Sequence, residues 1–192
     1  MMKGFFDQEY QPEEKASIPL LPRCGACGLF RSCKSPKMPW HGEGRRKILV
    51  IGEAPGEVED REGRPFIGPS GQLLRKELGK IGMDLDRDCW TTNSLICRPW
   101  KEDERGQVWN RPPTDREVDH CRPNIVRAVK ELNPETIILL GAHATKSLLG
   151  WLWRNDNVGG IERWRGWRLP IQSINAWVCP AWHPSFMLRA SG

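Results

Sequence analysis

The sequence predicts an α/β protein of three layers, α/β/α, in which a central and mostly parallel sheet lies between helices. Two observations carry this prediction. Short apolar runs alternate along the chain with segments of helical spacing, which is typical of a parallel, doubly wound sheet. Three polar side chains, Glu53, Asn93 and His183, lie at or near the ends of such runs, where open α/β sheets bind ligands.

The first half of the chain predicts two strands and a helix. Residues 47–51 are an apolar run that ends at Gly52, as expected of a buried strand. Residues 70–81 have helical spacing. The apolar side of this helix comprises Leu73, Leu74, Leu78 and Ile81. Residues 90–96 predict the second strand, and residues 100–113 are polar, lack apolar periodicity and are expected to form a loop.

The second half begins with a capping box, in which Thr114 is followed three residues later by Glu117. This box opens a helix that Pro134 ends. Its apolar stripe comprises Val118, Cys121, Ile125, Val129 and Leu132. Residues 136–140 predict a third strand and residues 142–149 a short helix. Two weaker strand candidates complete the sheet, over residues 167–171 and 176–180.

The bulk properties favour one domain. Residues 1–23 are polar and contain three prolines, which predicts a poorly ordered lead-in, and residues 24–192 are expected to form the domain. The net charge of +5 fits an acidic polymer as partner, although as weak support. The sequence shows no signal peptide and no apolar run long enough to span a bilayer. We therefore expect a cytoplasmic protein with no membrane contact, and we expect it to be a monomer.

The cysteines suggest a metal centre. A chain of this kind without an export signal is expected to use its seven cysteines as thiols or metal ligands. Cys24 and Cys27 form a C-x-x-C pair, and with Cys97 and Cys121 they make a set that suits a [4Fe–4S] cluster or a zinc ion. Spacing alone leaves two alternatives open. Cys121 can be a small apolar residue on a helix face, and Cys33 can replace one ligand.

Six motifs follow one another in a fixed order. They are GEAPGEVED (52–60), GRPFIGPSGQLL (63–74), TNSLICRP (92–99), NRP (110–112), CRP (121–123) and HPSFMLR (183–189). This series resembles the family-four uracil-DNA glycosylases, the group that carries a [4Fe–4S] cluster. The resemblance assigns Cys24, Cys27, Cys97 and Cys121 to the cluster in preference to zinc. It also implies that the cluster ties the N-terminal cysteine loop to the sheet.

The chemistry of base excision requires particular groups. Breaking the bond between a base and deoxyribose leaves positive charge on the sugar and negative charge on the base. The site therefore needs a hydrogen-bond donor at the base and a carboxylate near the sugar. A base flipped out of the stack also needs a flat stacking partner and an amide that reads its edge.

The resemblance gives each of these roles a residue. It implies that His183 donates to uracil O2 and that Glu53 positions the attacking water. It implies that Phe66 stacks on uracil, that Asn93 pairs with its edge, and that Glu59 lies against C5, where bulk excludes a thymine methyl group. Each residue also has a purely structural alternative, such as a satisfied loop histidine, an exposed carboxylate, a core phenylalanine or a turn asparagine.

Further residues are expected to contact the nucleotide or the DNA. The loop over residues 52–56 brings Gly52 and Ala54 to the substrate, because glycine permits close backbone approach. Met187 and Leu188 are apolar residues beside His183 that suit a wedge in the duplex, and Arg189 suits a phosphate contact. Residues 163–168 alternate arginine with tryptophan. They suit DNA as well, but we favour an ordinary exposed hairpin whose tryptophans pack inward.

The predicted activity is that of a monofunctional glycosylase acting on uracil in single- or double-stranded DNA and starting base excision repair. The alternatives are a weak or inactive module of the same fold that binds DNA, and a zinc or redox scaffold. The chain ends soon after the histidine motif, which we expect to affect activity, and its loop between Cys97 and Cys121 is longer than usual for the family. A related group forms a covalent adduct through a histidine in an inserted loop. Here no histidine precedes His120 in that loop, so hydrolysis is favoured.

Overall fold

A five-stranded sheet forms the centre of the molecule. The computed structural model describes residues 24–155 and 157–190, so the expected lead-in over residues 1–23 lies outside the described residues. The strands lie in the order β2-β1-β5-β7-β6. Their bounds are β1 Ile48–Gly52, β2 Cys89–Asn93, β5 Thr136–Leu140, β6 Leu169–Ile171 and β7 Ala176–Ala181. All neighbouring pairs are parallel except the pair of β6 with β7, which confirms the mostly parallel sheet.

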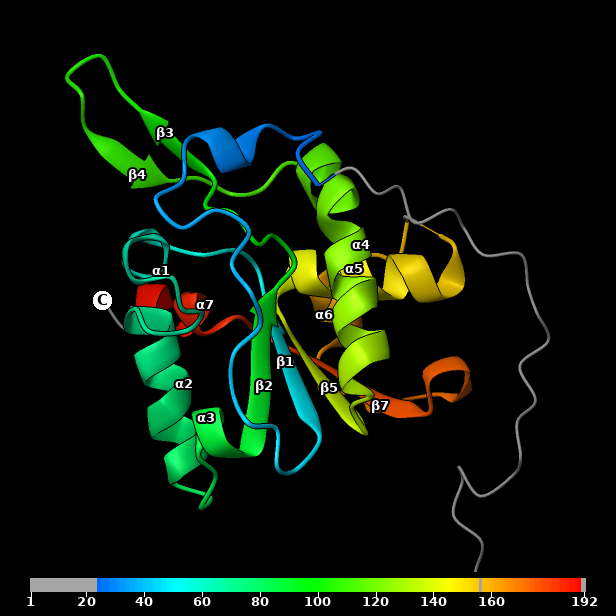
Figure 1. Cartoon of the computed structure of the whole chain (residues 1–192). Helices are drawn as coiled ribbons and strands as arrows, with labels where there is room; N and C mark the ends of the chain where they lie inside the picture. Colours follow the sequence, from blue (N-terminus) through cyan, green and yellow to red (C-terminus); the bar gives the residue numbers. More distant parts are fainter. Residues whose placement is uncertain (1–23, 156, 191–192) are drawn as a thin grey trace, which may run out of the picture.

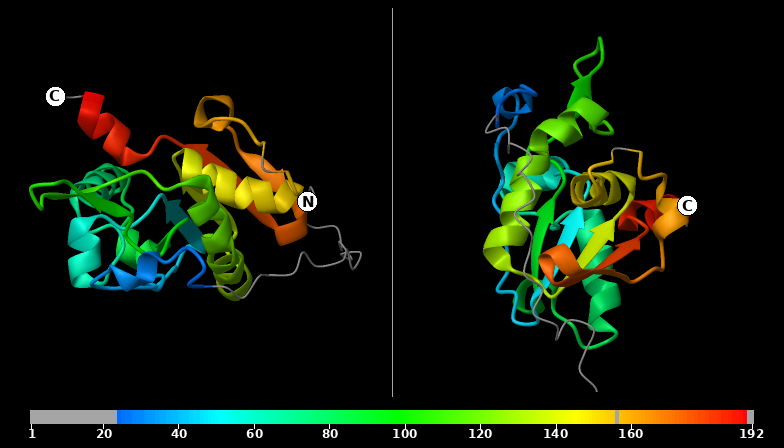
Figure 2. Two further views of the ribbon diagram at one scale, coloured as in Figure 1. Left: turned by 90° about the horizontal axis from the view of Figure 1, so that it is seen from above. Right: turned by 90° about the vertical axis from the view of Figure 1, so that its right-hand side faces the viewer.

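Helices cover both faces of this sheet. One layer contains α4 Asp115–Leu132, α5 Ala142–Trp153 and the short α6 Ile161–Trp164; the other contains α1 Glu57–Glu62, α2 Pro69–Gly79, α3 Leu85–Asp88 and α7 Pro184–Ala190. Successive residues of β1 point to opposite faces: Leu49 and Ile51 pack in the core with α4 and α5, whereas Val50 packs in the core with α2 and α3. The three layers are visible in Figure 1 and in the turned views of Figure 2. The predicted α/β/α class is confirmed.

The helix α4 begins at the predicted capping box. The Thr114 hydroxyl accepts a hydrogen bond from the Glu117 backbone N–H, and the Glu117 carboxylate accepts one from the Thr114 N–H. The same carboxylate accepts a hydrogen bond from each terminal nitrogen of Arg111, at 2.6 and 2.9 Å. These hydrogen bonds lower the pKa of Glu117 to about 2, and those from Arg111 contribute most to the shift. Arg111 thus joins the NRP motif to the start of α4.

Replacing Glu117 by glutamine is expected to destabilise the protein by about 3 kcal/mol at neutral pH. The carboxyl pKa is lower in the folded state than the ordinary value of 4.5, so its contribution is complete above that value. It is lost as the pH falls toward about 2. Urea unfolding of both proteins across this range should show the two stabilities converging as the pH falls. A difference that stays constant would contradict the assignment.

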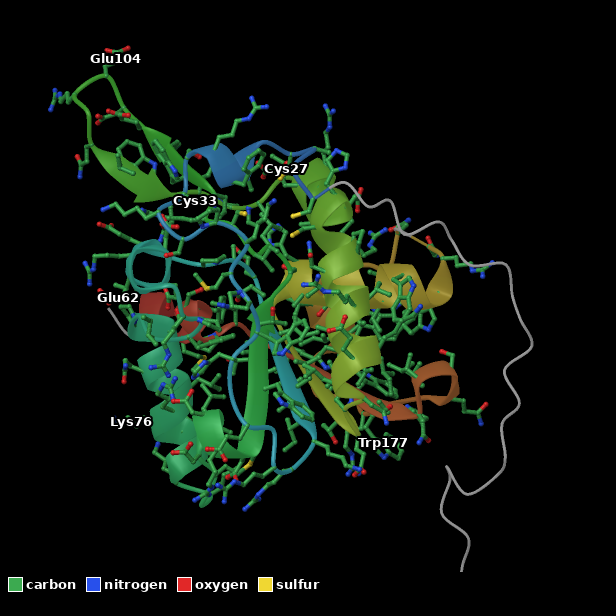
Figure 3. The ribbon with its side chains drawn as sticks, viewed as in Figure 1. Cys27, Cys33, Glu62, Lys76, Glu104 and Trp177 are labelled. Carbon is green, nitrogen blue, oxygen red and sulfur yellow. The ribbon has the colours of Figure 1, made fainter. Side chains whose placement is uncertain are left out.

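The stretch expected to be a loop over residues 100–113 contains an antiparallel hairpin, so this prediction was wrong. Its strands are β3 Trp100–Glu102 and β4 Val108–Asn110. The Asp103 carboxylate closes the tip by accepting from the backbone N–H groups of Arg105 and Gln107. Strands of three residues are too short to give a periodic signal. Figure 1 shows the hairpin projecting from the domain, and Glu104 marks its tip in Figure 3.

Other predicted boundaries also changed. The helix α2 ends at Gly79, and Ile81 lies beyond it, 68% exposed, rather than on its apolar side. The second strand ends at Asn93, because the chain turns there and the Ser94 N–H donates to the carbonyl of Gly52. The helix α5 continues to Trp153. The helices α1, α3, α6 and α7 and two 3₁₀ turns, Leu29–Arg31 and Gln172–Ile174, were not predicted. No helix of the described chain is long and apolar enough to cross a membrane.

The segment 163–168 is not a hairpin with inward tryptophans. Trp164 is half-buried and donates from its indole N–H to the carbonyl of Val158, as expected of a packed tryptophan. Trp167, however, is 62% exposed. The preference for two inward-facing tryptophans was therefore wrong for one of the two.

Candidate active site

A cavity of about 450 Å³ opens at the carboxyl edge of the sheet. Its wall includes six of the predicted site residues, namely Glu53, Ala54, Glu59, Phe66, Asn93 and His183. The residues come from the segments that follow β1, β2 and β7, as the topology of an open α/β sheet requires. The structure therefore brings together residues that are up to 130 positions apart in the sequence (53 to 183).

The floor of the cavity depends on Gly52, the last residue of β1. A Cβ atom there would overlap the side-chain oxygen of Asn93 and would lie 2.7 Å from the ring of Phe66. Glycine therefore allows the amide and the ring to approach the strand together. Asn93 is 6% exposed, and no side chain or backbone group of the described residues hydrogen-bonds its amide. A buried amide of this kind is suited to bind a ligand with both a donor and an acceptor.

Phe66 has a strained backbone. Its φ angle is 58°, a conformation that non-glycine residues rarely adopt and that is concentrated at functional sites. The carbonyl of Phe66 packs against the first turn of α2, where a Cβ atom on Gly71 would overlap it. The close packing holds the ring at the cavity wall, 5% exposed.

Glu59 holds two loops together. Its carboxylate accepts one hydrogen bond from the Gly56 N–H at 3.1 Å and another from the Gly68 N–H at 2.7 Å. Gly56 precedes α1 and Gly68 precedes α2. The carboxylate lies at the cavity wall, but its hydrogen bonds give it a structural task that the sequence did not predict.

His183 connects β7 to α7, and its ring orientation is set by Ser185. The ring Nδ1 accepts the backbone N–H of Ser185 at 3.2 Å, and the Ser185 hydroxyl lies 2.8 Å from the same nitrogen. Because a backbone N–H can only donate, Nδ1 carries no proton, and in the neutral ring the proton lies on Nε2. His183 is the only histidine among the described residues that line the cavity. It can therefore donate one hydrogen bond from Nε2.

Glu53 has a histidine partner that the sequence analysis missed. The carboxylate oxygen Oε2 lies 2.9 Å from Nδ1 of His143, in the first turn of α5. Donating this hydrogen bond to Glu53 raises the pKa of His143 above its ordinary value, although burial opposes the shift. His143 lies three residues after the third predicted strand, near the same edge of the sheet as the other site residues. That position was the available sequence signal.

The outer wall of the cavity includes Asn110 from the hairpin. Its side-chain oxygen accepts a hydrogen bond from Nε of Arg98 at 2.7 Å, so that its amide nitrogen is the atom of Asn110 that faces Gly56. Arg98 is buried, and its Nη2 lies 3.5 Å from the Glu57 carboxylate. Asn110 belongs to a motif that the sequence analysis quoted without giving it a role.

The four predicted cysteine ligands line a second, smaller cavity. Cys24 and Cys27 come from the N-terminal segment, Cys97 from the segment after β2, and Cys121 from α4. Figure 3 labels Cys27 and Cys33 on the N-terminal segment, which passes beside the hairpin and the start of α4. Backbone N–H groups already face two of the sulfur atoms: Lys37 N lies 3.3 Å from Cys97 Sγ, and Ile96 N lies 3.4 Å from Cys121 Sγ.

These donors suit thiolates better than neutral thiols. Burial raises the pKa of the Cys121 thiol to about 12 and raises that of Cys97, so their thiolate forms would need an adjacent cation. Among the described residues, no three His, Cys, Asp or Glu side chains lie close enough to hold a single metal ion. A tetrahedral zinc ion would bring thiolates to about 3.8 Å from one another, whereas a four-iron cluster holds its ligands further apart.

Together, the fold and the cavity define an α/β protein whose sheet edge brings together a carboxylate, an amide, a phenylalanine ring and a histidine. A model of the Uracil DNA glycosylase superfamily matches residues 39–192. The chain is 32% identical to the "Type-4 uracil-DNA glycosylase" of Pyrobaculum aerophilum, over 88% of this chain and 82% of that protein. It is 34% identical to proteins of the same name from Sulfurisphaera tokodaii (86% of this chain, 71% of that one) and Saccharolobus solfataricus (86% and 73%). The chain therefore belongs to the uracil DNA glycosylase superfamily and, within it, to the type-4 family.

Proposed function

We propose that this protein is a uracil-DNA glycosylase that hydrolyses the N-glycosidic bond of deoxyuridine in DNA and so starts base excision repair. The observation that carries the proposal is the cavity wall shared by Glu53, Phe66, Asn93 and His183. Relatives over most of the chain are named for the same activity. We further propose that residues 24–192 act as one domain and as a monomer, and that the protein is cytoplasmic.

The cavity suits a flipped uracil. Phe66 offers a flat face for stacking, and the Asn93 amide can both donate to and accept from the edge of the base. Ala54 belongs to the adjoining wall, whereas Gly52 is not part of that wall and contributes by leaving room for Asn93 and Phe66. We assign Glu59 to the C5 side of the ring, and its hydrogen bonds to the starts of two helices support a rigid wall there.

Bond cleavage is assigned to His183 and Glu53. As the bond between C1′ and N1 lengthens, its electron pair stays with uracil, and negative charge gathers on O2. The Nε2–H group of His183 stabilises that charge without a proton being transferred. The Glu53 carboxylate stabilises the cationic sugar and orients the water whose oxygen bonds to C1′. The water proton leaves to solvent or to the base, and the products are free uracil and an abasic site.

The cavity supports a monofunctional reaction. No lysine is present among the described residues of its wall, so no amine is in place to form a Schiff base with the sugar. The hairpin over residues 100–110 contributes Asn110 and no histidine to that wall. Hydrolysis by water, rather than a covalent adduct with the protein, therefore fits the site.

We propose that Cys24, Cys27, Cys97 and Cys121 hold a [4Fe–4S] cluster, with zinc as the less favoured alternative. The four thiols share one cavity, and N–H groups face Cys97 and Cys121. When bound, the cluster supplies a covalent cross-link between distant segments. Through that link, the N-terminal segment and α4 would be held against the segment that follows Asn93.

The DNA is proposed to lie across α7 and the arginine-tryptophan segment 163–168. Three consecutive side chains of α7 are exposed, Phe186, Met187 and Leu188, and they suit a wedge that fills the gap left by the flipped nucleotide. Arg189 follows in the same helix, but its side chain lies outside the described structure. The ring of Phe186 stacks on Trp182 at 4.6 Å, and the Arg165 guanidinium lies 5.5 Å from the same Trp182 ring. Arg165 is thereby joined to Trp182, which directly precedes His183.

Replacing Trp167 by alanine is expected to weaken binding of single-stranded DNA by about 5- to 100-fold, because an exposed indole can stack on a base. Replacing Arg165 by alanine should weaken binding and reduce the slope of log K against log salt by about one unit. Fluorescence anisotropy at several salt concentrations measures both effects. The control is Ile81→Ala, an exposed apolar residue that follows α2 and lies outside the proposed surface. Binding unchanged by both substitutions at 163–168 would remove this segment from the DNA surface.

The proposed function is tested by incubating the purified, metal-loaded protein with uracil-containing single- and double-stranded oligonucleotides. Released uracil, together with strands that break only after alkali treatment, is the expected result. A folded and metal-loaded protein that binds these oligonucleotides without releasing uracil would instead support the binding-module alternative.

A further inference from the structure

His143 stands directly beside the carboxylate to which hydrolysis is assigned. The strand order places β5 next to β1, and Gly141 ends β5 in a left-handed conformation with φ of 89°. This turn starts α5 close to the cavity, since a Cβ atom on Gly141 would come within 3.1 Å of His183 Cβ. Four neighbouring strands thus present four side chains in order: Asn93, Glu53, His143 and His183.

The hydrogen bond between His143 and Glu53 has a defined direction. An ionised carboxylate only accepts, so the Nδ1 of His143 carries a proton and donates it to Oε2 across 2.9 Å. This is opposite to His183, whose Nδ1 accepts from Ser185. Both partners are largely shielded from water, with side chains 23% and 33% exposed, and His143 does not itself line the cavity.

The charges around His143 come from three elements. Glu53 follows β1, Asp115 begins α4, and Lys146 lies one turn further along α5. Lys146 and Asp115 form an ion pair of 2.8 Å. Their effects on the pKa of His143 oppose each other, since Asp115 raises it and Lys146 lowers it, so the hydrogen bond to Glu53 is the leading cause of the raised pKa.

We propose that His143 is a positioning residue, which fixes the Glu53 carboxylate in the orientation that the attacking water and the cationic sugar require. A glutamate side chain has three rotatable bonds, and a hydrogen bond from a rigid helix removes much of that freedom. The histidine acts through the carboxylate and does not touch the substrate. This inference rests on the proposed glycosylase function.

The first test is a double-mutant cycle in single-turnover uracil release. His143→Ala is expected to slow release by about 10- to 100-fold, with DNA affinity unchanged. His143→Asn should recover a large part of the rate, because its amide can donate from nearly the position of Nδ1. In a Glu53→Gln background, His143→Ala should cost less than about threefold. If His143→Ala slowed release as strongly in the Glu53→Gln background as in the wild type, the proposal would be overturned. It would also be overturned if His143→Ala alone released uracil at the wild-type rate.

The second test does not depend on activity. The pKa of His143, measured by NMR titration of its ring protons, is expected to fall in Glu53→Gln, and an unchanged value overturns the proposal. The matched control for the release assay of the first test is His41→Ala. His41 also lies near a carboxylate, 3.9 Å from Asp86, but outside the cavity wall, so its loss should leave release unchanged. If the wild type released no uracil, the proposed function would fail, while the titration would still decide the Glu53–His143 link.

Discussion

Replacing His183 by alanine is expected to lower the single-turnover rate of uracil release by about 10²- to 10³-fold, the usual effect of losing one donor to a developing anion. The reason is specific to the ring's environment. The Ser185 N–H occupies Nδ1, so the proton lies on Nε2 before substrate binds. The donor is therefore already in place as charge develops on uracil O2, and the ground-state affinity for DNA should change little.

The neighbouring serine provides the control. Ser185→Ala removes the hydroxyl that lies 2.8 Å from Nδ1 but keeps the backbone N–H that sets the proton position. Its rate should fall by less than about tenfold. Uracil release by His183→Ala at the wild-type rate would take His183 out of its assigned role, whereas an equal and large loss in both variants would indicate that the hydroxyl, rather than the backbone, orients the ring.

Replacing Cys121 by alanine is expected to remove most of the bound iron and to lower the free energy of unfolding by about 3 kcal/mol or more, because metal binding and folding are coupled. Cys121 is 8% exposed in the core formed with Leu95, Ile96 and Val118. Alanine fits this apolar site, so loss of packing alone would cost about 1 kcal/mol. Iron analysis, the visible absorption spectrum and urea unfolding together separate the two causes.

Two other cysteines serve as matched controls. Cys179→Ala changes a half-buried thiol of β7 far from the four-cysteine cavity and should retain the cluster. Cys33→Ala tests the alternative ligand, because Cys33 Sγ donates to the carbonyl oxygens of Leu29 and Arg98 and is absent from that cavity wall. Retained iron in Cys121→Ala would leave Cys121 as an apolar core residue, and stoichiometric zinc in a colourless wild type would favour zinc over the cluster.

The strands of the central sheet and the two longest helices could be predicted because their sequence signals are local. The run at residues 136–140 matches β5 at both ends, and the capping box at Thr114 marks the start of α4. Apolar runs buried on both faces and reciprocal caps depend on neighbouring residues alone. The hairpin was missed for the opposite reason. It is stabilised by cross-strand contacts, such as Lys101 over the Trp109 ring at 5.3 Å, which no periodicity reports.

Several residues of the cavity wall could be named from the sequence, but the hydrogen bonds between them and their neighbours could not. Glu53, Phe66, Asn93 and His183 could be named from the motifs, and all of them line one cavity. The link between Glu53 and His143 spans 90 positions, and it depends on β5 pairing beside β1, which the sequence does not state. Likewise, the two backbone hydrogen bonds of Glu59 depend on how the starts of α1 and α2 meet in space.

The hairpin of β3 and β4 has a consequence for how this chain can vary. Its two ends are anchored, since the Trp100 indole donates to the Ser32 carbonyl and Arg98 holds Asn110, while its tip at Glu104 extends into solvent (Figure 3). Residues added between Asp103 and Gln107 would lengthen the arm without displacing either anchor, at little entropic cost. The tip can therefore tolerate changes in loop length, and a tether or a reporter can be inserted there.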